Sequence, residues 1–164
     1  MHNLDTYMKT KHDLANQLQL LDAYFTLGQT DKAERLAKSV IAQFRDEQQL
    51  LKLNCPGLIQ FYIDTVLEER LFEWSFEIEL LTSAIGNYDS ALLSFIQSCL
   101  LDFKQRVETK SLITLSLFES VDEIECIIAL SGEIIDITNV LKHCRYSSDE
   151  IIEYKYVIKK DIRN

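Results

Sequence analysis

The sequence predicts an all-α fold built from antiparallel helix hairpins, and three observations support this prediction. Only one proline and four glycines occur in 164 residues, so turns are scarce and long helices are favoured over many short strands. Apolar residues recur at helical spacing through the first half of the chain. The length suits one domain that buries roughly 70% of its unfolded surface. We therefore expect a single helical domain over residues 1–164, arranged as regular hairpins or as an irregular α-bundle.

The clearest element is a hairpin of two helices over residues 13–53. Leu14, Leu18, Leu21 and Phe25 follow one another at helical spacing, and Gly28 interrupts the pattern. A second helix begins near residue 31. Its apolar face comprises Ala33, Leu36, Ala37, Val40, Ile41 and Phe44. Two helices joined by so few residues are expected to pack antiparallel.

A second hairpin is predicted over residues 57–109. The segment 54–57 contains Pro56 and Gly57 and forms the strongest break in the chain. A long helix is expected from about residue 58 to residue 85, where Gly86 ends it. Another helix is expected from about residue 88 to residue 108, with Leu92, Phe95 and Cys99 facing inward.

The segment 112–164 allows two interpretations. Residues 112–118 are rich in β-forming residues, and Tyr154, Tyr156 and Ile158 alternate as in a strand. The shortage of turn residues favours helices instead, and we expect helices here. The alternative is an α+β protein with a small C-terminal sheet.

Two segments resemble the tetratricopeptide repeat. Residues 21–36 read LDAYFTLGQTDKAERL, and residues 84–92 read AIGNYDSAL, with glycine and alanine where the two helices of that repeat meet. The two glycines, Gly28 and Gly86, lie 58 residues apart rather than 34, so the array is irregular. The resemblance implies a non-enzymatic adaptor that binds another protein. A self-assembling structural or inhibitor-type protein, and an enzyme without a recognisable motif, are the alternatives.

The charge distribution indicates the kind of partner. The net charge is −9, and residues 61–136 carry fifteen acidic and four basic residues. This acidic middle disfavours nucleic acid and favours a protein with a basic surface. Glu69, Glu73 and Glu77 recur at every fourth position of a predicted helix, with Trp74, the single tryptophan, between them. We expect these four residues to bind a partner, although a solvated helix face and a core tryptophan would give the same pattern.

No catalytic, cofactor-binding or metal-binding residues are predicted. The histidines His2, His12 and His143 lie in no metal-ligand motif, and the neighbouring His143 and Cys144 point about 100° apart on a helix. A glycine-rich phosphate loop is absent from the sequence. The cysteines are widely spaced and indicate free thiols. We expect a cytoplasmic protein without a cofactor, a signal peptide or a membrane span, and leave open that it forms a homo-oligomer.

Overall fold

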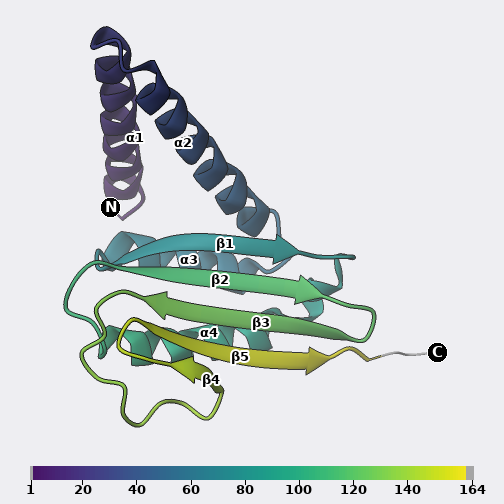
Figure 1. Ribbon diagram of the computed structural model, residues 1–164. Coiled ribbons are helices and arrows are strands. Elements are labelled where there is room, and N and C mark those ends of the chain that lie inside the picture. The colour runs from purple at the N-terminus through teal and green to yellow at the C-terminus, as the bar shows by residue number, and fades with distance from the viewer. Residues whose placement is uncertain (1, 162–164) are drawn as a thin grey trace. The chain divides into compact units, whose positions relative to one another are not determined.

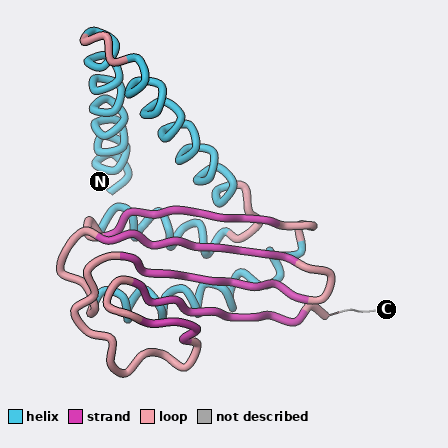
Figure 2. Tube along the Cα trace, viewed as in Figure 1, coloured by secondary structure: helices cyan, strands magenta, loops and turns pink. Residues whose placement is uncertain are grey.

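The computed structural model describes residues 2–161, without the side chains at positions 2, 3, 6 and 7. It contains helices and a five-stranded sheet, so the predicted all-α fold is wrong and the alternative, an α+β protein, is confirmed. The chain forms two compact units, residues 1–45 and 46–164, and the division falls within a helix. Figure 2 shows the helical and strand segments of each unit.

Unit 1 is a helical hairpin, as expected from the sequence. Helix α1 spans His2–Thr26, and helix α2 begins at Thr30 and ends at Leu51. Gly28 has a φ of 68°, and its N–H and that of Gln29 bond the carbonyls of Phe25 and Tyr24. This pattern is a Schellman motif, which satisfies the last carbonyls of α1 and needs a residue that tolerates the left-handed conformation.

The two helices of unit 1 meet near this turn. Ala33 is fully buried there, and the Lys32 ammonium lies 5.9 Å from the centre of the Tyr24 ring. Away from the turn α1 and α2 diverge (Figure 1). The small side chain of Ala33 allows the close approach, whereas the rest of each helix presents much of its surface outward.

Unit 2 contains the sheet. Helix α3 (Pro56–Glu68), strand β1 (Phe72–Glu79), the short 3-10 helix η1 (Ala84–Tyr88) and helix α4 (Asp89–Lys104) come first. Strands β2 (Ser111–Glu119), β3 (Glu123–Ser131), β4 (Cys144–Ser147) and β5 (Ile151–Lys159) follow. The predicted helix over 58–85 and the helices expected over 112–164 are therefore wrong. A strand replaces the second part of the former, and three long strands and one short strand replace the latter.

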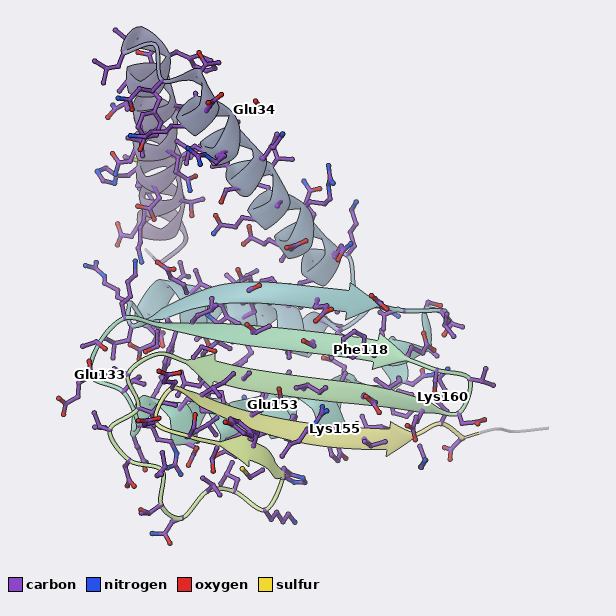
Figure 3. All side chains as sticks on the ribbon, viewed as in Figure 1. Glu34, Phe118, Glu133, Glu153, Lys155 and Lys160 are labelled. Carbon is purple, nitrogen blue, oxygen red and sulfur yellow. The ribbon has the colours of Figure 1, made fainter. Side chains whose placement is uncertain are left out.

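The strand order is β1-β2-β3-β5-β4, in which β1 pairs parallel with β2 and all other pairs are antiparallel. Helices α3 and α4 cover one face of the sheet (Figure 1). The core lies between that face and the two helices, and its largest fully buried side chains include Phe103, Leu117 and Tyr154. The opposite face, called here the open face, carries side chains such as Phe118, Glu153 and Lys155 (Figure 3).

Two polar contacts fix the connections of unit 2. The Asp89 carboxylate, at the start of α4, accepts hydrogen bonds from the N–H groups of Gly57 and Leu58 and so caps α3. The Arg106 guanidinium forms a bidentate ion pair with Asp102 and donates to three carbonyls of the β3–β4 loop, those of Asp136, Thr138 and Asn139. Tyr154 donates its hydroxyl hydrogen to the same Asp102 carboxylate, at 2.5 Å.

None of the helices in the described part of the chain combines the length and the apolar composition that a membrane crossing requires.

Candidate functional site

The candidate site is His12 on α1. Its side chain is 74% exposed, so the imidazole is open to another molecule. Both contacts of the ring are made by Nδ1, which lies 3.3 Å from the amide nitrogen Nδ2 of Asn16 and 3.6 Å from Oδ1 of Asp13. Asn16 is one helical turn after His12 and therefore lies beside it on the same face. The imidazole is therefore exposed, with Asp13 and Asn16 beside Nδ1 and with Nε2 on the opposite side of the ring.

Two lysines precede this histidine in the sequence. Lys9 precedes His12 by one turn, and Lys11 is its immediate neighbour. The spacing of three residues places Lys9 beside His12 on the helix surface. The Asp13 carboxylate lies 3.6 Å from Nδ1, and the Lys9 ammonium on the preceding turn adds a positive charge that attracts an anionic ligand.

Large apolar side chains are also exposed on the same hairpin. Unit 1 presents them on both helices, in contrast to the usual burial of such residues. They are Leu4, Met8, Leu18, Leu20, Phe25, Leu27, Ile41 and Phe44, each between 41% and 69% exposed. On α1, Leu4, Met8, Leu18 and Phe25 recur at intervals typical of a helix–helix interface, and Met8 lies one turn before His12. His12 thus lies at the margin of an apolar surface.

The third histidine has a different environment. His143 is half-buried, and its ring lies 5.4 Å from that of Phe95 and 5.7 Å from that of Tyr156, edge to face in both cases. These contacts are those of a packed aromatic cluster. The side chain of His2 lies outside the described residues.

The cysteines are held as thiols by burial. Burial, with a smaller contribution from Asp89, raises the pKa of Cys55 to about 11, and burial with Asp102 nearby raises that of Cys99 to about 12. Burial also raises the pKa of Cys126. A thiol with a raised pKa holds little thiolate at neutral pH, so these three side chains are poor nucleophiles.

The four residues predicted to bind a partner do not lie on one helix. Glu69 follows α3 and its Oε2 lies 3.4 Å from Nζ of Lys104. Glu73 and Glu77 are in β1 and point to the open face, whereas Trp74 points to the opposite face and packs edge to face on Tyr62. The structure therefore places Glu73 and Glu77 on the same face of β1, with Trp74 on the other face and Glu69 outside the strand.

Residues 2–53 match the family model described as the α-helical domain of SpoOB-type sensor kinases. The match covers unit 1 and the end of α2, which is less than half of the chain. A comparison with curated protein sequences finds no match.

Two solved structures resemble the chain at a low level. One is the histidine kinase ThkA in complex with the response regulator TrrA, at 8% identity and a TM-score of 0.43, covering 95% of this chain. The other is the histidine kinase AdeS of Acinetobacter baumannii, at 11% identity and a TM-score of 0.42, covering 92% of this chain and 98% of AdeS. The chain spans 61% of the ThkA chain. At these TM-scores neither likeness carries an argument about function.

The family match corrects the functional prediction from the sequence. The hairpin matches a domain of sensor kinases, so the resemblance to the tetratricopeptide repeat is wrong, and with it the prediction of a non-enzymatic, repeat-type adaptor. Sequence reasoning passed over His12 because it tested histidines only against metal-ligand and nucleophile–base patterns. The signal was present as a histidine followed by Asp13 and, one turn later, by Asn16 on an amphipathic helix.

Proposed function

We propose that the protein is a phosphotransferase of histidine-based signalling and that His12 accepts a phosphoryl group and passes it to another protein. The observation that carries this proposal is the exposed imidazole of His12, oriented through Nδ1, within a segment that matches a sensor-kinase helical domain. The ammonium of Lys9, one turn before His12, suits the dianionic phosphoryl group.

The contacts of Nδ1 indicate which nitrogen reacts. The Asp13 carboxylate, 3.6 Å from Nδ1, favours a proton on that atom. This tautomer requires the Asn16 amide to turn its oxygen toward Nδ1 in place of its nitrogen. The lone pair of the neutral imidazole then lies on Nε2. We propose that Nε2 attacks the phosphorus atom of a donor, so that a P–N bond forms while the bond from phosphorus to the leaving group breaks. The electron pair of that bond departs with the leaving group.

The exposed apolar face supports a second part of the proposal, the association of two hairpins. Four helices from two copies would bury the stripe of Leu4, Met8, Leu18 and Phe25 together with Ile41 and Phe44 of α2. Because His12 lies at the margin of this stripe rather than within it, its Nε2 remains accessible to a phosphoryl donor in such a bundle.

The test is phosphorylation of the whole chain with phosphoramidate, a small phosphoryl donor for histidine. We expect one phosphoryl group per chain, stable in base and lost in acid, as for a phosphohistidine, and detected by 31P NMR and intact mass. His12→Ala is expected to abolish it. His143→Ala, which removes a half-buried imidazole, is the matched control and is expected to leave the modification unchanged.

Modification of His12→Ala to the wild-type level would overturn the proposal. A second arm uses ATP as the donor in place of phosphoramidate. Transfer from ATP to His12 by the chain alone would make the protein an autokinase, whereas transfer only from a phosphorylated protein would make it a relay component.

A further inference from the structure

The edge of the sheet at β1 is a second surface that the proposed function does not use. β1 is the outermost strand on one side, and its eight residues pair with β2 in an unbroken parallel register from Phe72 to Glu79. Figure 1 shows β1 at one edge of the sheet and β4 at the other. An edge strand presents a row of backbone N–H and C=O groups that can pair with another chain.

The outward backbone groups of β1 can be assigned from the register. The carbonyl of Leu71 accepts the N–H of Ser111, and in a parallel pair alternate residues direct both backbone groups to the same side. The backbone N–H and C=O groups of residues 73, 75, 77 and 79 therefore point to β2. Those of Phe72, Trp74, Phe76 and Ile78 point away from the sheet. Within residues 2–161, these four outward positions have no backbone hydrogen-bond partner beyond β1.

The other edge of the sheet is protected in a way that β1 is not. β4 has four residues, its register with β5 shifts between Cys144 and Tyr146, and it carries Arg145. Short length, a register shift and a basic side chain are common devices against pairing with another sheet. β1 has none of these: it is long, regular and free of proline and lysine.

β1 does carry charged side chains, which also discourage edge pairing, and its charges are all negative. Glu73, Glu77 and Glu79 are exposed and share the open face of the strand. Pairing of β1 with β1 of a second copy would place glutamates of the two chains side by side on one face, which is destabilising. Lys110, 2.6 Å from Glu73, pairs with one of the three carboxylates, and both partners are more than 60% exposed.

We propose that the free edge of β1 binds an extended, basic segment of a partner protein as an added strand. The backbone groups of Phe72, Trp74, Phe76 and Ile78 would form the new ladder. Lysine or arginine at every second position of the partner would face Glu73, Glu77 and Glu79. The acidic face selects this partner over a second copy of the chain. Its glutamates repel the glutamates in β1 of another copy, whereas they attract a basic strand.

The probe is a short synthetic peptide with lysine at every second position and valine or threonine between. Trp74, the only tryptophan of the chain, lies in β1, so its fluorescence reports binding at this edge. We also expect slower amide hydrogen exchange at Phe72, Trp74, Phe76 and Ile78 in the presence of the peptide. A control peptide with the same charges carries N-methyl groups that block the backbone ladder. It is expected to bind at least about tenfold more weakly.

The variants separate charge from fold. The triple change Glu73→Gln, Glu77→Gln and Glu79→Gln is expected to weaken peptide binding about tenfold, because each exposed charge contributes modestly. Glu133→Gln, an exposed acid of the β3–β4 loop (Figure 3), is the matched control and is expected to have no effect. The proposal is overturned if the N-methylated peptide binds as tightly as the unmodified one, or if the peptide slows exchange at β4 and not at β1. It is also overturned if the chain alone forms assemblies larger than a dimer through pairing of its β1 strands.

Discussion

Unit 1, the helical hairpin, and unit 2, which contains the sheet and is called here the α/β unit, differ in where their large apolar side chains lie. In the α/β unit, Phe103, Leu117 and Tyr154 are fully buried between the sheet and its helices. In the hairpin, Leu4, Met8 and Phe25 are more than half exposed. Burial of apolar surface is the main stabilising term for a domain. The α/β unit therefore buries the apolar surface that stabilises it. The hairpin leaves much of its apolar surface exposed, where a partner can cover it.

This difference matches the two surfaces that we propose to be functional. The hairpin has an apolar face for association of helices and places His12 at its margin. The α/β unit has a closed core, and its proposed contact is the backbone edge and the charges of β1 rather than apolar side chains. Exposed apolar surface therefore marks the proposed contact in the hairpin, whereas strand topology marks it in the α/β unit.

The largest expected effect comes from removing one phenylalanine in each unit. Phe103 is fully buried and its ring stacks on Tyr154 at 5.4 Å, so Phe103→Ala should lower the free energy of unfolding by about 3–5 kcal/mol. Phe25 is 56% exposed, so Phe25→Ala should change the unfolding of the isolated chain by less than about 1 kcal/mol. In a bundle of two hairpins Phe25→Ala should instead promote dissociation. Urea unfolding followed through Trp74 measures the first effect, and light scattering at several concentrations measures the second.

If Phe103→Ala and Phe25→Ala lowered the free energy of unfolding equally, with no change in solution mass, the two units would not differ in the burial of their apolar side chains. That result would mean that the face around Phe25 is covered within one chain. A wild-type mass of a monomer at every concentration would contradict the association of hairpins alone and leave the role of His12 untouched.

The hairpin was predictable from the sequence because its signals are local. The period of the apolar residues and the conformation of Gly28 each depend on a few neighbours. Strand β1 was missed for a reason that its residues make plain. Phe72, Trp74, Phe76 and Ile78 alternate with polar residues, as in a strand, yet Glu73 and Glu77 are four residues apart. A spacing of four matches one helical turn and also two strand repeats, so it does not distinguish the two.

The central strands were missed for a different reason. β3 is buried or half-buried along its length, and its residues 126–130 form a continuous apolar run without a clear period. β2 does alternate at Ile113, Leu115 and Leu117, but the shortage of turn residues favoured helices over this signal. The pairing of β1 with β2, such as Phe72 with Ser111, joins residues 39 positions apart, which no local pattern contains. For His12 the sequence contained the residues of the site but not their exposure, which decides whether a histidine is packed or available.

The next effect in size compares two ion pairs with the same spacing of four residues on a helix. Arg106 and Asp102 are nearly buried and form a bidentate pair, whereas Lys38 and Glu34 of α2 are more than half exposed. Arg106→Met should lower the free energy of unfolding by about 3 kcal/mol, because it leaves Asp102 unpaired and frees the β3–β4 loop. Lys38→Met should change it by about 0.3–0.5 kcal/mol. Urea unfolding of both variants checks the contrast.

Hydrogen exchange of the β3–β4 loop gives the second measurement for Arg106→Met. The N–H of Ile134 and that of Ile135 bond carbonyls outside the loop, and that of Ile135 bonds the Arg106 carbonyl. Faster exchange at both, with unchanged exchange in β2, is expected. A loss of stability below about 1 kcal/mol would show that water replaces the guanidinium at little cost and that the pair behaves like the one in the hairpin.

The smallest of these effects depends on pH and again concerns a buried charge in the α/β unit. The Glu119 side chain is fully buried, and its carboxylate lies 2.6 Å from Nζ of Lys160. Burial alone raises the pKa of Glu119, but hydrogen bonds from Lys160, Thr82 and Leu81 outweigh burial and lower that pKa to about 2. The folded-state pKa is thus below the ordinary value of 4.5. The stabilisation is complete above pH 4.5 and is lost as the pH falls toward 2.

Glu119→Gln should therefore lower the free energy of unfolding by roughly 2–3 kcal/mol at pH 7, with the difference from wild type vanishing near pH 2. Urea unfolding at several pH values between 2 and 7, with the exposed Glu133→Gln as control, measures this dependence. Lys160→Met should give the same trend, because it removes the cation that faces the carboxylate. If the difference in the free energy of unfolding between wild type and Glu119→Gln were instead constant across this range, the pKa of Glu119 would be the same in the folded and unfolded states.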